Sequence, residues 1–281
     1  MARAQTLPDV TGQLWRYTTR AADTFVDIAR WYNLGFVELR AANPAVDPWL
    51  PGDGTELILP TVHLLPDAPR RGITVNLGDQ RIYRYDDDGA VAATYAIGIG
   101  QEGWGTPNGS TRITRLRRDP VWIPPASIRA EQPDLPAVVP AGPDNPMGAF
   151  AIDLGFTSGA YRIHGTNQPY AVGRRVSHGC IRLYPEGIAE LFEAVKVGTP
   201  VTVVDQRAKV GMHGGRLYLE THMADAALDA MEEGRVPDPE PMPEAFERVA
   251  AASARYGIEI SWPRVEETIL RRSGMPVVVG A

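Results

Sequence analysis

The sequence predicts a mainly β domain that follows a small α/β unit and precedes a helical extension. Short apolar runs separated by turn residues fill residues 72–205, and this spacing is typical of a β-sandwich or barrel. Residues 15–61 carry alternating strand and helix signals, and residues 206–281 carry mostly helical periodicity. The 281 residues, 44% of them hydrophobic and 22% charged, are enough for one large or two modest domains with a real core.

The first unit reads as strand, helix, helix, strand. A short strand at 17–19 leads to Asp23, a plausible N-cap for a helix that runs to about residue 32. A second helix at 36–42 ends before an Asn-Pro pair, because the residue before proline disfavours helix. After a Pro-Gly turn, residues 56–59 form the closing strand.

This layout resembles a LysM module over about 45 residues. The resemblance implies binding to the N-acetylglucosamine-containing glycan of peptidoglycan or chitin; the alternative is a purely structural cap. The matching residues are Asp23, Thr24, Ala29, Tyr32, Asn33, Leu39, Asn43, Pro44, Pro51, Gly52, Leu57, Ile58, Leu59 and Pro60.

The β-rich region begins after an expected linker at 62–71. Strands are predicted at 73–77, 81–85 and 91–99, with turn residues between them. Residues 119–146 contain so many prolines that we expect a functional loop or lid there instead of sheet. Downstream, periodicity and turn signals predict helices at 185–195, 222–234, 243–256 and 262–272 and strands at 199–205 and 216–220.

The only cysteine of the chain lies in a motif that also holds a histidine, Ser177-His178-Gly179-Cys180, and a second histidine, His164, precedes it by sixteen positions. A cysteine nucleophile needs a base to take its proton. It also needs backbone N–H groups aimed at the developing oxyanion. The alternatives are a buried structural cysteine and a zinc site formed by His164, His178 and Cys180.

The two motif segments, His164-Gly165 and Ser177-His178-Gly179-Cys180, resemble the signature of the YkuD-type L,D-transpeptidase domain. The resemblance spans roughly residues 72–205, which implies a YkuD-like β-sandwich. Further matching segments lie at 106–109, 142–148 and 161–164. The segment at 144–148 is similar to that of the periplasmic, ErfK/YbiS-like subgroup, which includes lipoprotein-anchoring enzymes.

The resemblance implies a role for each matching catalytic residue. Cys180 is expected as the nucleophile and His164 as its general base. The Gly165 carbonyl is expected to orient the imidazole, and His178 to shape the site. The backbone N–H groups of His178, Gly179 and Cys180 are expected to form the oxyanion hole.

For substrate binding the resemblance implies Arg182, which suits a carboxylate, together with Tyr161 and Ser177. The implied reaction forms a thioester with a peptidoglycan tetrapeptide stem and passes the acyl group to an amine. This forms a 3-3 crosslink or attaches a protein to the wall. Neither a metal nor another cofactor is expected. The same thiol could instead serve an L,D-carboxypeptidase or crosslink hydrolase, or the chain could be a non-catalytic wall-binding protein.

Charge and hydropathy narrow the partners. The formal net charge of -6 argues against nucleic acid as the main partner, because phosphate binding requires a basic face. No apolar run is long enough to span a membrane, and residues 1–10 lack the apolar segment of a secretory signal. The expected location, the periplasm, follows from the family resemblance, as do the expected partners, peptidoglycan and a wall-anchored lipoprotein.

Overall fold

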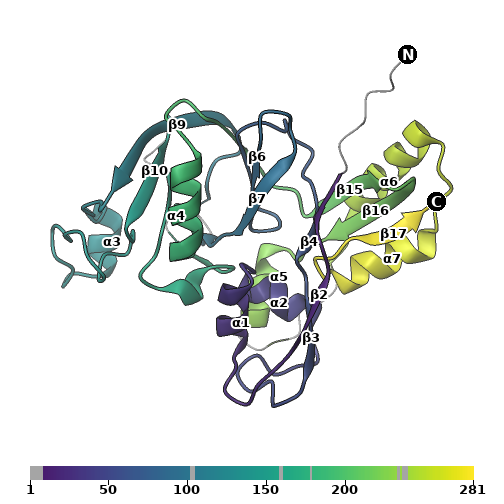
Figure 1. The fold of residues 1–281 in the computed structure, drawn as a ribbon, viewed down its shortest axis with the longest axis horizontal. Helices are drawn as coiled ribbons and strands as arrows, with labels where there is room; N and C mark the ends of the chain where they lie inside the picture. Colours follow the sequence, from purple (N-terminus) through teal and green to yellow (C-terminus); the bar gives the residue numbers. More distant parts are fainter. Residues whose placement is uncertain (1–8, 102–104, 158–160, 178, 233–234, 236–239) are drawn as a thin grey trace.

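The computed structural model describes residues 9–101, 105–157, 161–177, 179–232, 235 and 240–281. The largest sheet in this part of the chain has eight strands. They are β5 (Ile73–Asn76), β6 (Arg81–Tyr85), β7 (Val91–Ala96), β9 (Gly109–Arg118), β10 (Phe150–Leu154), β11 (Arg162–His164), β13 (Ile181–Arg182) and β14 (Pro200–Val204). Their order across the sheet is β13-β11-β10-β9-β14-β5-β6-β7 (Figure 1).

The sheet curls until its two ends meet. Gly98, which follows β7, exchanges backbone hydrogen bonds of 2.8 and 2.9 Å with Arg182 of β13. A short parallel pair, β8 (Ile99–Gly100) with β12 (Arg175–Ser177), lies at the same seam. The β-rich region predicted at 72–205 is therefore one curled sheet of eight strands with the short β8–β12 pair at its seam.

Alternating residues of these strands form the main hydrophobic core. Val75 and Ile152, for example, have no exposed surface. Helix α4 (Pro185–Ala194) packs against β10 and buries Ile188 and Leu191 in the same core. The predicted helix at 185–195 is thus confirmed, and its apolar face is the one that the sequence periodicity indicated.

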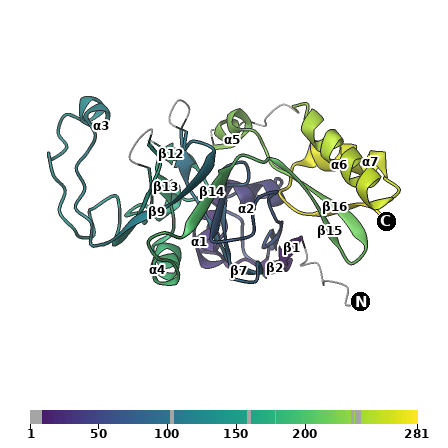
Figure 2. The same ribbon diagram turned by 90° about the horizontal axis from the view of Figure 1, so that it is seen from above.

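The proline-dense residues 119–146 project from the sheet beyond β9 and β10 (Figures 1 and 2). They contain α3 (Ala126–Glu131) and a bridge in which Trp122 and Val139 exchange backbone hydrogen bonds of 2.9 and 2.8 Å. The expectation of a loop in place of a sheet strand is confirmed. The short helix and the bridge were not predicted.

The N-terminal unit has the predicted strand-helix-helix-strand order. Strand β2 (Trp15–Thr18) pairs with β3 (Glu56–Leu59), and α1 (Phe25–Trp31) and α2 (Phe36–Ala42) come between them. The expected linker at 62–71 is partly wrong, because its first residues form β4. This strand (Val62–Leu64) pairs with β1 (Val10–Gly12), a partner more than 50 positions away that local sequence signals cannot reveal.

The predicted N-cap of α1 is wrong by one residue. Thr24 is the N-cap, and its side chain accepts a hydrogen bond from the backbone N–H of Asp27 at 3.3 Å. Asp23 instead accepts hydrogen bonds from the Tyr17 hydroxyl at 2.7 Å and the Arg20 backbone N–H at 2.8 Å. It therefore stabilises the turn before the helix.

Helix α2 and the turn before it lie directly against the curled sheet. Asn33 Nδ2 donates to the Thr94 carbonyl at 2.7 Å, and Asn33 Oδ1 accepts from the Ala96 backbone N–H. Buried Arg81 of β6 forms an ion pair of 2.6 Å with Glu38 of α2. These contacts fix the N-terminal unit on the sheet.

The C-terminal region contains a sheet as well as helices. Strands β15 (Ala208–His213), β16 (Arg216–Thr221) and β17 (Val277–Gly280) form one antiparallel sheet. The predicted strand at 216–220 is confirmed, whereas β15 and β17 were missed. The predicted helices appear as α5 (Asp225–Glu232), α6 (Pro243–Tyr256) and α7 (Trp262–Arg271), of which α6 and α7 pack on this sheet. Within the described ranges, no helix is long and apolar enough to cross a membrane.

Candidate active site

Two neighbouring strands position the motif residues. β11 and β13 run parallel, with Ile163 opposite Ile181 and His164 opposite Arg182. Cys180 directly precedes β13, so it lies beside the first residue of β11, Arg162. The fold therefore brings the thiol and the histidine, sixteen positions apart in sequence, to adjacent strands at one end of the sheet.

His164 is a buried, neutral imidazole. Its Nδ1 lies 2.6 Å from the Gly165 carbonyl oxygen. Burial, followed by the positive charge of Arg182, lowers the His164 pKa from 6.5 to about 4. A carbonyl acceptor at Nδ1 selects the tautomer with a proton there, which leaves the Nε2 lone pair free to accept one.

Cys180 is a free thiol with partial exposure. Burial raises its pKa, while the charges of Arg162 and Arg182 and a hydrogen bond from the Arg162 backbone N–H favour the thiolate. Burial dominates, so at neutral pH the resting site holds a thiol and a neutral imidazole. Such a pair needs proton transfer to the histidine during attack, because no thiolate is formed in advance.

Hydrogen bonds hold the turn before the nucleophile. Thr106 Oγ1 donates to the Gly179 carbonyl at 2.9 Å, and Ser177 Oγ donates to the Cys180 carbonyl at 2.5 Å. Gly179 has a φ of +91°, which L side chains rarely adopt. In a trans peptide the N–H points away from the carbonyl, so fixing the Gly179 carbonyl fixes the direction of the Cys180 N–H.

Arg182 offers a charge beside the thiol. Its guanidinium is largely buried, and its Nε has no hydrogen-bond partner among the described residues. Burial lowers its pKa, and the nearby Cys180 and Tyr170 oppose that shift. A buried guanidinium with an unused donor is suited to a carboxylate.

The other predicted residues have different surroundings. Tyr161 packs edge to face on Phe156, with ring centroids 5.8 Å apart, so its ring contributes to the core. The Ser177 hydroxyl donates its hydrogen bond to the Cys180 carbonyl and so stabilises the turn. His178, predicted to shape the site and to supply an oxyanion N–H, lies outside the described residues.

A carboxylate bridge beneath the site was missed. Asp153 of β10 accepts from Arg162 Nε at 2.8 Å and from Arg117 Nε and Nη2 at 2.9 and 2.6 Å. It thereby fixes the strand residue whose N–H reaches Cys180. Only the strand register, which pairs Asp153 with Arg162, could have revealed this contact.

The base of the proline-dense segment is tied to the histidine. Asn145, with no exposed surface, donates from Nδ2 to the carbonyls of Pro120 and Pro140 at 2.8 and 3.0 Å. Its Oδ1 accepts from the Met147 backbone N–H at 2.9 Å, and the Met147 carbonyl faces the His164 ring. Asn145 therefore connects the projecting segment to the surroundings of His164.

A second cluster of titratable groups lies between the curled sheet and the C-terminal sheet. Asp79, Glu220 and His222 are close enough to hold a metal ion. However, the buried ammonium of Lys209 bonds to both carboxylates at 2.6 Å. Its single positive charge offsets one of the two negative charges, and its bonds to both carboxylates make these residues a structural ion network.

Comparisons with known proteins agree with the motif. The family described as the L,D-transpeptidase catalytic domain, YkuD, matches residues 70–203. The probable L,D-transpeptidase YcfS of Escherichia coli (strain K12) is 41% identical over 260 residues, covering 90% of this chain and 79% of that protein. The probable L,D-transpeptidase ErfK/SrfK of Salmonella typhimurium (strain LT2) is 40% identical over 259 residues, covering 89% and 80%.

Among solved structures, the NMR structure of the catalytic domain from E. faecium L,D-transpeptidase acylated by ertapenem is 27% identical. The match covers 49% of this chain and 99% of that one, with a TM-score of 0.37.

The curled sheet places a thiol and a histidine on adjacent strands, and these are groups that a cysteine acyltransferase needs. The two relatives are about 40% identical to this chain, and the matches cover most of their length, so they identify the family. The chain belongs to the L,D-transpeptidase family, whose members are acyltransferases acting on peptidoglycan.

Proposed function

We propose that this L,D-transpeptidase works through a thioester on Cys180, with His164 as the base. The observation that carries the proposal is the buried, neutral His164 on β11, which pairs with β13, the strand that directly follows the only cysteine of the chain. The Gly165 carbonyl holds the Nδ1 proton, so Nε2 can take the proton of the thiol. A base with a lowered pKa remains deprotonated at the pH where the enzyme works.

The first half-reaction cleaves the peptide bond after the third residue of a tetrapeptide stem. As Cys180 attacks the carbonyl carbon, its proton passes to His164, and the N–H groups of Gly179 and Cys180 stabilise the oxyanion. The C–N bond then breaks, and His164 returns the proton to the departing D-alanine amine. Arg182 binds a carboxylate of the stem, and the product is an acyl thioester.

The second half-reaction restores the thiol. An acceptor amine loses a proton to His164 and attacks the thioester carbonyl, and the sulfur leaves with that proton. The acceptor is the diamino acid of another stem, which gives a 3-3 crosslink, or the lysine of a wall-anchored lipoprotein. Water attacking the same thioester would instead release the tripeptide, and this hydrolysis is the alternative outcome.

Intact mass after incubation with a carbapenem tests the nucleophile. We expect one adduct on the parent protein and none on Cys180→Ala. His164→Ala should be acylated at least about 100-fold more slowly than the parent, because general base catalysis contributes roughly 10²–10⁴-fold. The matched control is His213→Ala, which removes an exposed histidine and should acylate at the parental rate. An adduct on Cys180→Ala would overturn the proposal.

Product analysis with a tetrapeptide and an amine acceptor tests the second step. Mass spectrometry should show the crosslinked peptide and released D-alanine. If free tripeptide forms regardless of the amine concentration, the enzyme is a carboxypeptidase. The periplasm is the compartment we propose, because the peptidoglycan substrate lies there; fractionation of the native host tests it.

We further propose that the chain divides into a glycan-binding LysM-like module at 15–61, a catalytic domain at 72–205 and an extension at 206–281. Trp31 and Trp49 are 59% and 56% exposed, and such indole faces suit the apolar faces of sugar rings. Sedimentation with insoluble peptidoglycan should fall for Trp31→Ala/Trp49→Ala. Equal sedimentation of the parent and this variant would favour a purely structural cap.

A further inference from the structure

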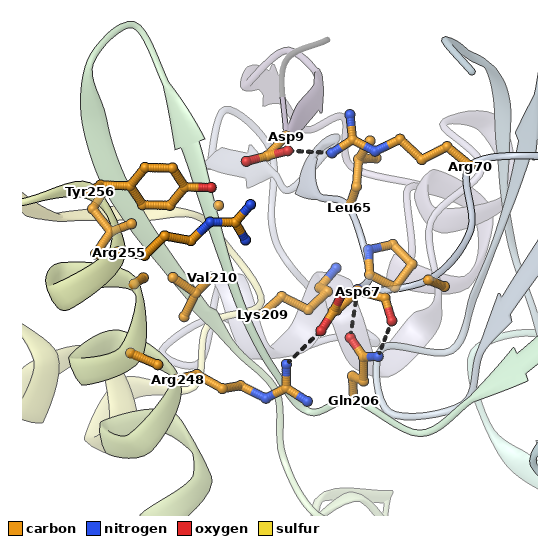
Figure 3. A pocket seen from close by; sticks show the side chains of 16 residues that line it. Asp9, Leu65, Asp67, Arg70, Gln206, Lys209, Val210, Arg248, Arg255 and Tyr256 are labelled. Carbon is orange, nitrogen blue, oxygen red and sulfur yellow. Dashed lines mark hydrogen bonds and ion pairs between the residues drawn. The ribbon is translucent and has the colours of Figure 1, made fainter. Parts of the chain in front are cut away.

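A pocket of about 340 Å³ lies between the C-terminal region and the segment that leads into the curled sheet (Figure 3). One wall is the segment at 65–70, the other is α6, and β15 lies beneath them. Neither Cys180 nor His164 lines it, so it is separate from the candidate active site. Its volume lies within the roughly 300–1,000 Å³ typical of small-ligand sites.

The pocket combines an apolar base with cationic walls. Val210 supplies apolar surface at the base, and Ala251 and Ala252 add to it from α6. Arg248 and Arg255 come from α6, seven positions apart, so both lie on the same helix face about 10 Å from each other along the axis. Figure 3 shows both guanidinium groups directed into the pocket.

These two arginines have donors to spare. Arg248 lies 3.8 Å from a carboxylate oxygen of Asp67, too long for a hydrogen bond, and that side chain is 89% exposed. Among the described residues, Arg255 contacts the ring of Tyr256, 5.2 Å from its centroid, and forms no ion pair. Lys209 adds no free charge, because buried carboxylates neutralise its ammonium.

We propose that this pocket binds a carboxylate-bearing stem peptide of peptidoglycan, as a second stem site in addition to the catalytic one. Guanidinium groups bind planar carboxylates through paired N–H donors, and the apolar base accepts the methyl and methylene groups of the peptide. The choice of a stem peptide as the ligand rests on the proposed function, since a peptidoglycan strand presents many stems to one enzyme. An acidic segment of a partner protein is the competing source.

The test is a calorimetric titration of a synthetic stem tetrapeptide into the full chain carrying Cys180→Ala, which prevents turnover. Adding Arg248→Ala/Arg255→Ala should weaken binding by about tenfold or more, since a hydrogen bond to a charged group contributes roughly 1.5–3 kcal/mol. The matched control is Arg264→Ala/Arg271→Ala, which removes the same charge from exposed positions on α7. This control should bind as the parent does.

A second background separates the two stem sites. Adding Arg182→Ala removes a carboxylate contact of the catalytic cleft, and the binding that remains should still depend on Arg255. The fully amidated tetrapeptide should not bind there. The proposal would be overturned if the Arg248→Ala/Arg255→Ala variant bound the peptide with parental affinity. It would also be overturned if this variant and the control variant lost affinity equally. Equal binding of an acidic peptide of unrelated sequence would assign the pocket to a protein partner instead. A missing carbapenem adduct would count against Cys180 and leave this titration unaffected.

Discussion

Gly35 and Gly173 meet so closely that a Cβ on Gly173 would lie 2.2 Å from the Cα of Gly35. Gly35 is the N-cap of α2 in the N-terminal unit, and Gly173 lies shortly before β12 at the seam of the curled sheet. Beside them, the Arg174 guanidinium lies 4.1 Å from the centroid of the Phe36 ring. The backbone of the N-terminal unit thus supports the segment that leads to the nucleophile.

Gly173→Ala should destabilise the protein and lower acylation by a carbapenem. The new Cβ would collide with backbone atoms, and φ at this position is +77°, so we expect a loss of about 2–4 kcal/mol from overpacking and left-handed strain together. Urea unfolding measures the first effect and acylation rate the second. Gly257→Ala is the control. Its φ is +65°, but a Cβ at this position would contact nothing within 4 Å, so only the backbone strain would lower stability. Equal losses in the two variants would contradict the role of the contact.

Lys209→Met should be among the most destabilising single changes. It leaves Asp79 and Glu220 buried without a countercharge, which typically costs about 3–5 kcal/mol. Exposed Lys196 supplies the control, since Lys196→Met should change the free energy of unfolding by less than about 0.5 kcal/mol. Neutralising both carboxylates in the Lys209→Met background should restore part of the loss. A small effect of Lys209→Met alone would show that water reaches the cluster.

The motif can be recognised from the sequence alone, whereas most of the contacts that hold it in place cannot. The helix at 36–42 follows from local sequence signals, and the motif that contains His164 and Cys180 is recognisable from its constrained spacing. The Asp153 bridge, the β1–β4 pair and the strands β15 and β17 depend on long-range register, which a single sequence does not contain. The N-cap of α1 was misplaced because Asp23 and Thr24 are both good caps, and only tertiary contact with Tyr17 selects between them.

The acylation rate should begin to fall only at a pH far below the ordinary pKa range of histidine. The active form of His164 is neutral, and its pKa is lowered to about 4 from 6.5. The rate should therefore hold as pH falls from 7 to about 5 and drop near 4. Stopped-flow acylation across this range measures it, with far-UV circular dichroism as the check on folding. A limb near pH 6.5 would show an exposed, unperturbed imidazole.

The same shift predicts how stability responds to acid. The folded state keeps His164 neutral, so the unfolded state binds more protons once pH falls below 6.5. Its contribution to stability is complete above that value and is lost progressively toward pH 4; buried His63, whose pKa is also lowered well below 6.5, adds to the effect. The midpoint of urea unfolding should fall over this window. His164→Gln should flatten the dependence, and an unchanged slope would rule out this histidine as its source.

Asp153→Asn should change thiol reactivity as well as stability. The Asp153 charge raises the pKa of Cys180, and the carboxylate also binds Arg162 and Arg117. Without it, the thiol should titrate at lower pH, and alkylation by iodoacetamide should rise at a lower pH than in the parent. Loss of these charge-assisted hydrogen bonds should cost about 1–3 kcal/mol of stability.

Glu193→Gln provides the matched comparison for Asp153→Asn. It breaks the Arg118–Glu193 pair, whose side chains are 59% and 62% exposed, so its stability effect should stay within about 1 kcal/mol. Its alkylation profile should match that of the parent. If Asp153→Asn lowers stability without moving the alkylation profile, the carboxylate supports the strands alone. A shift of the profile to lower pH assigns to the Asp153 charge a direct effect on the pKa of the Cys180 thiol.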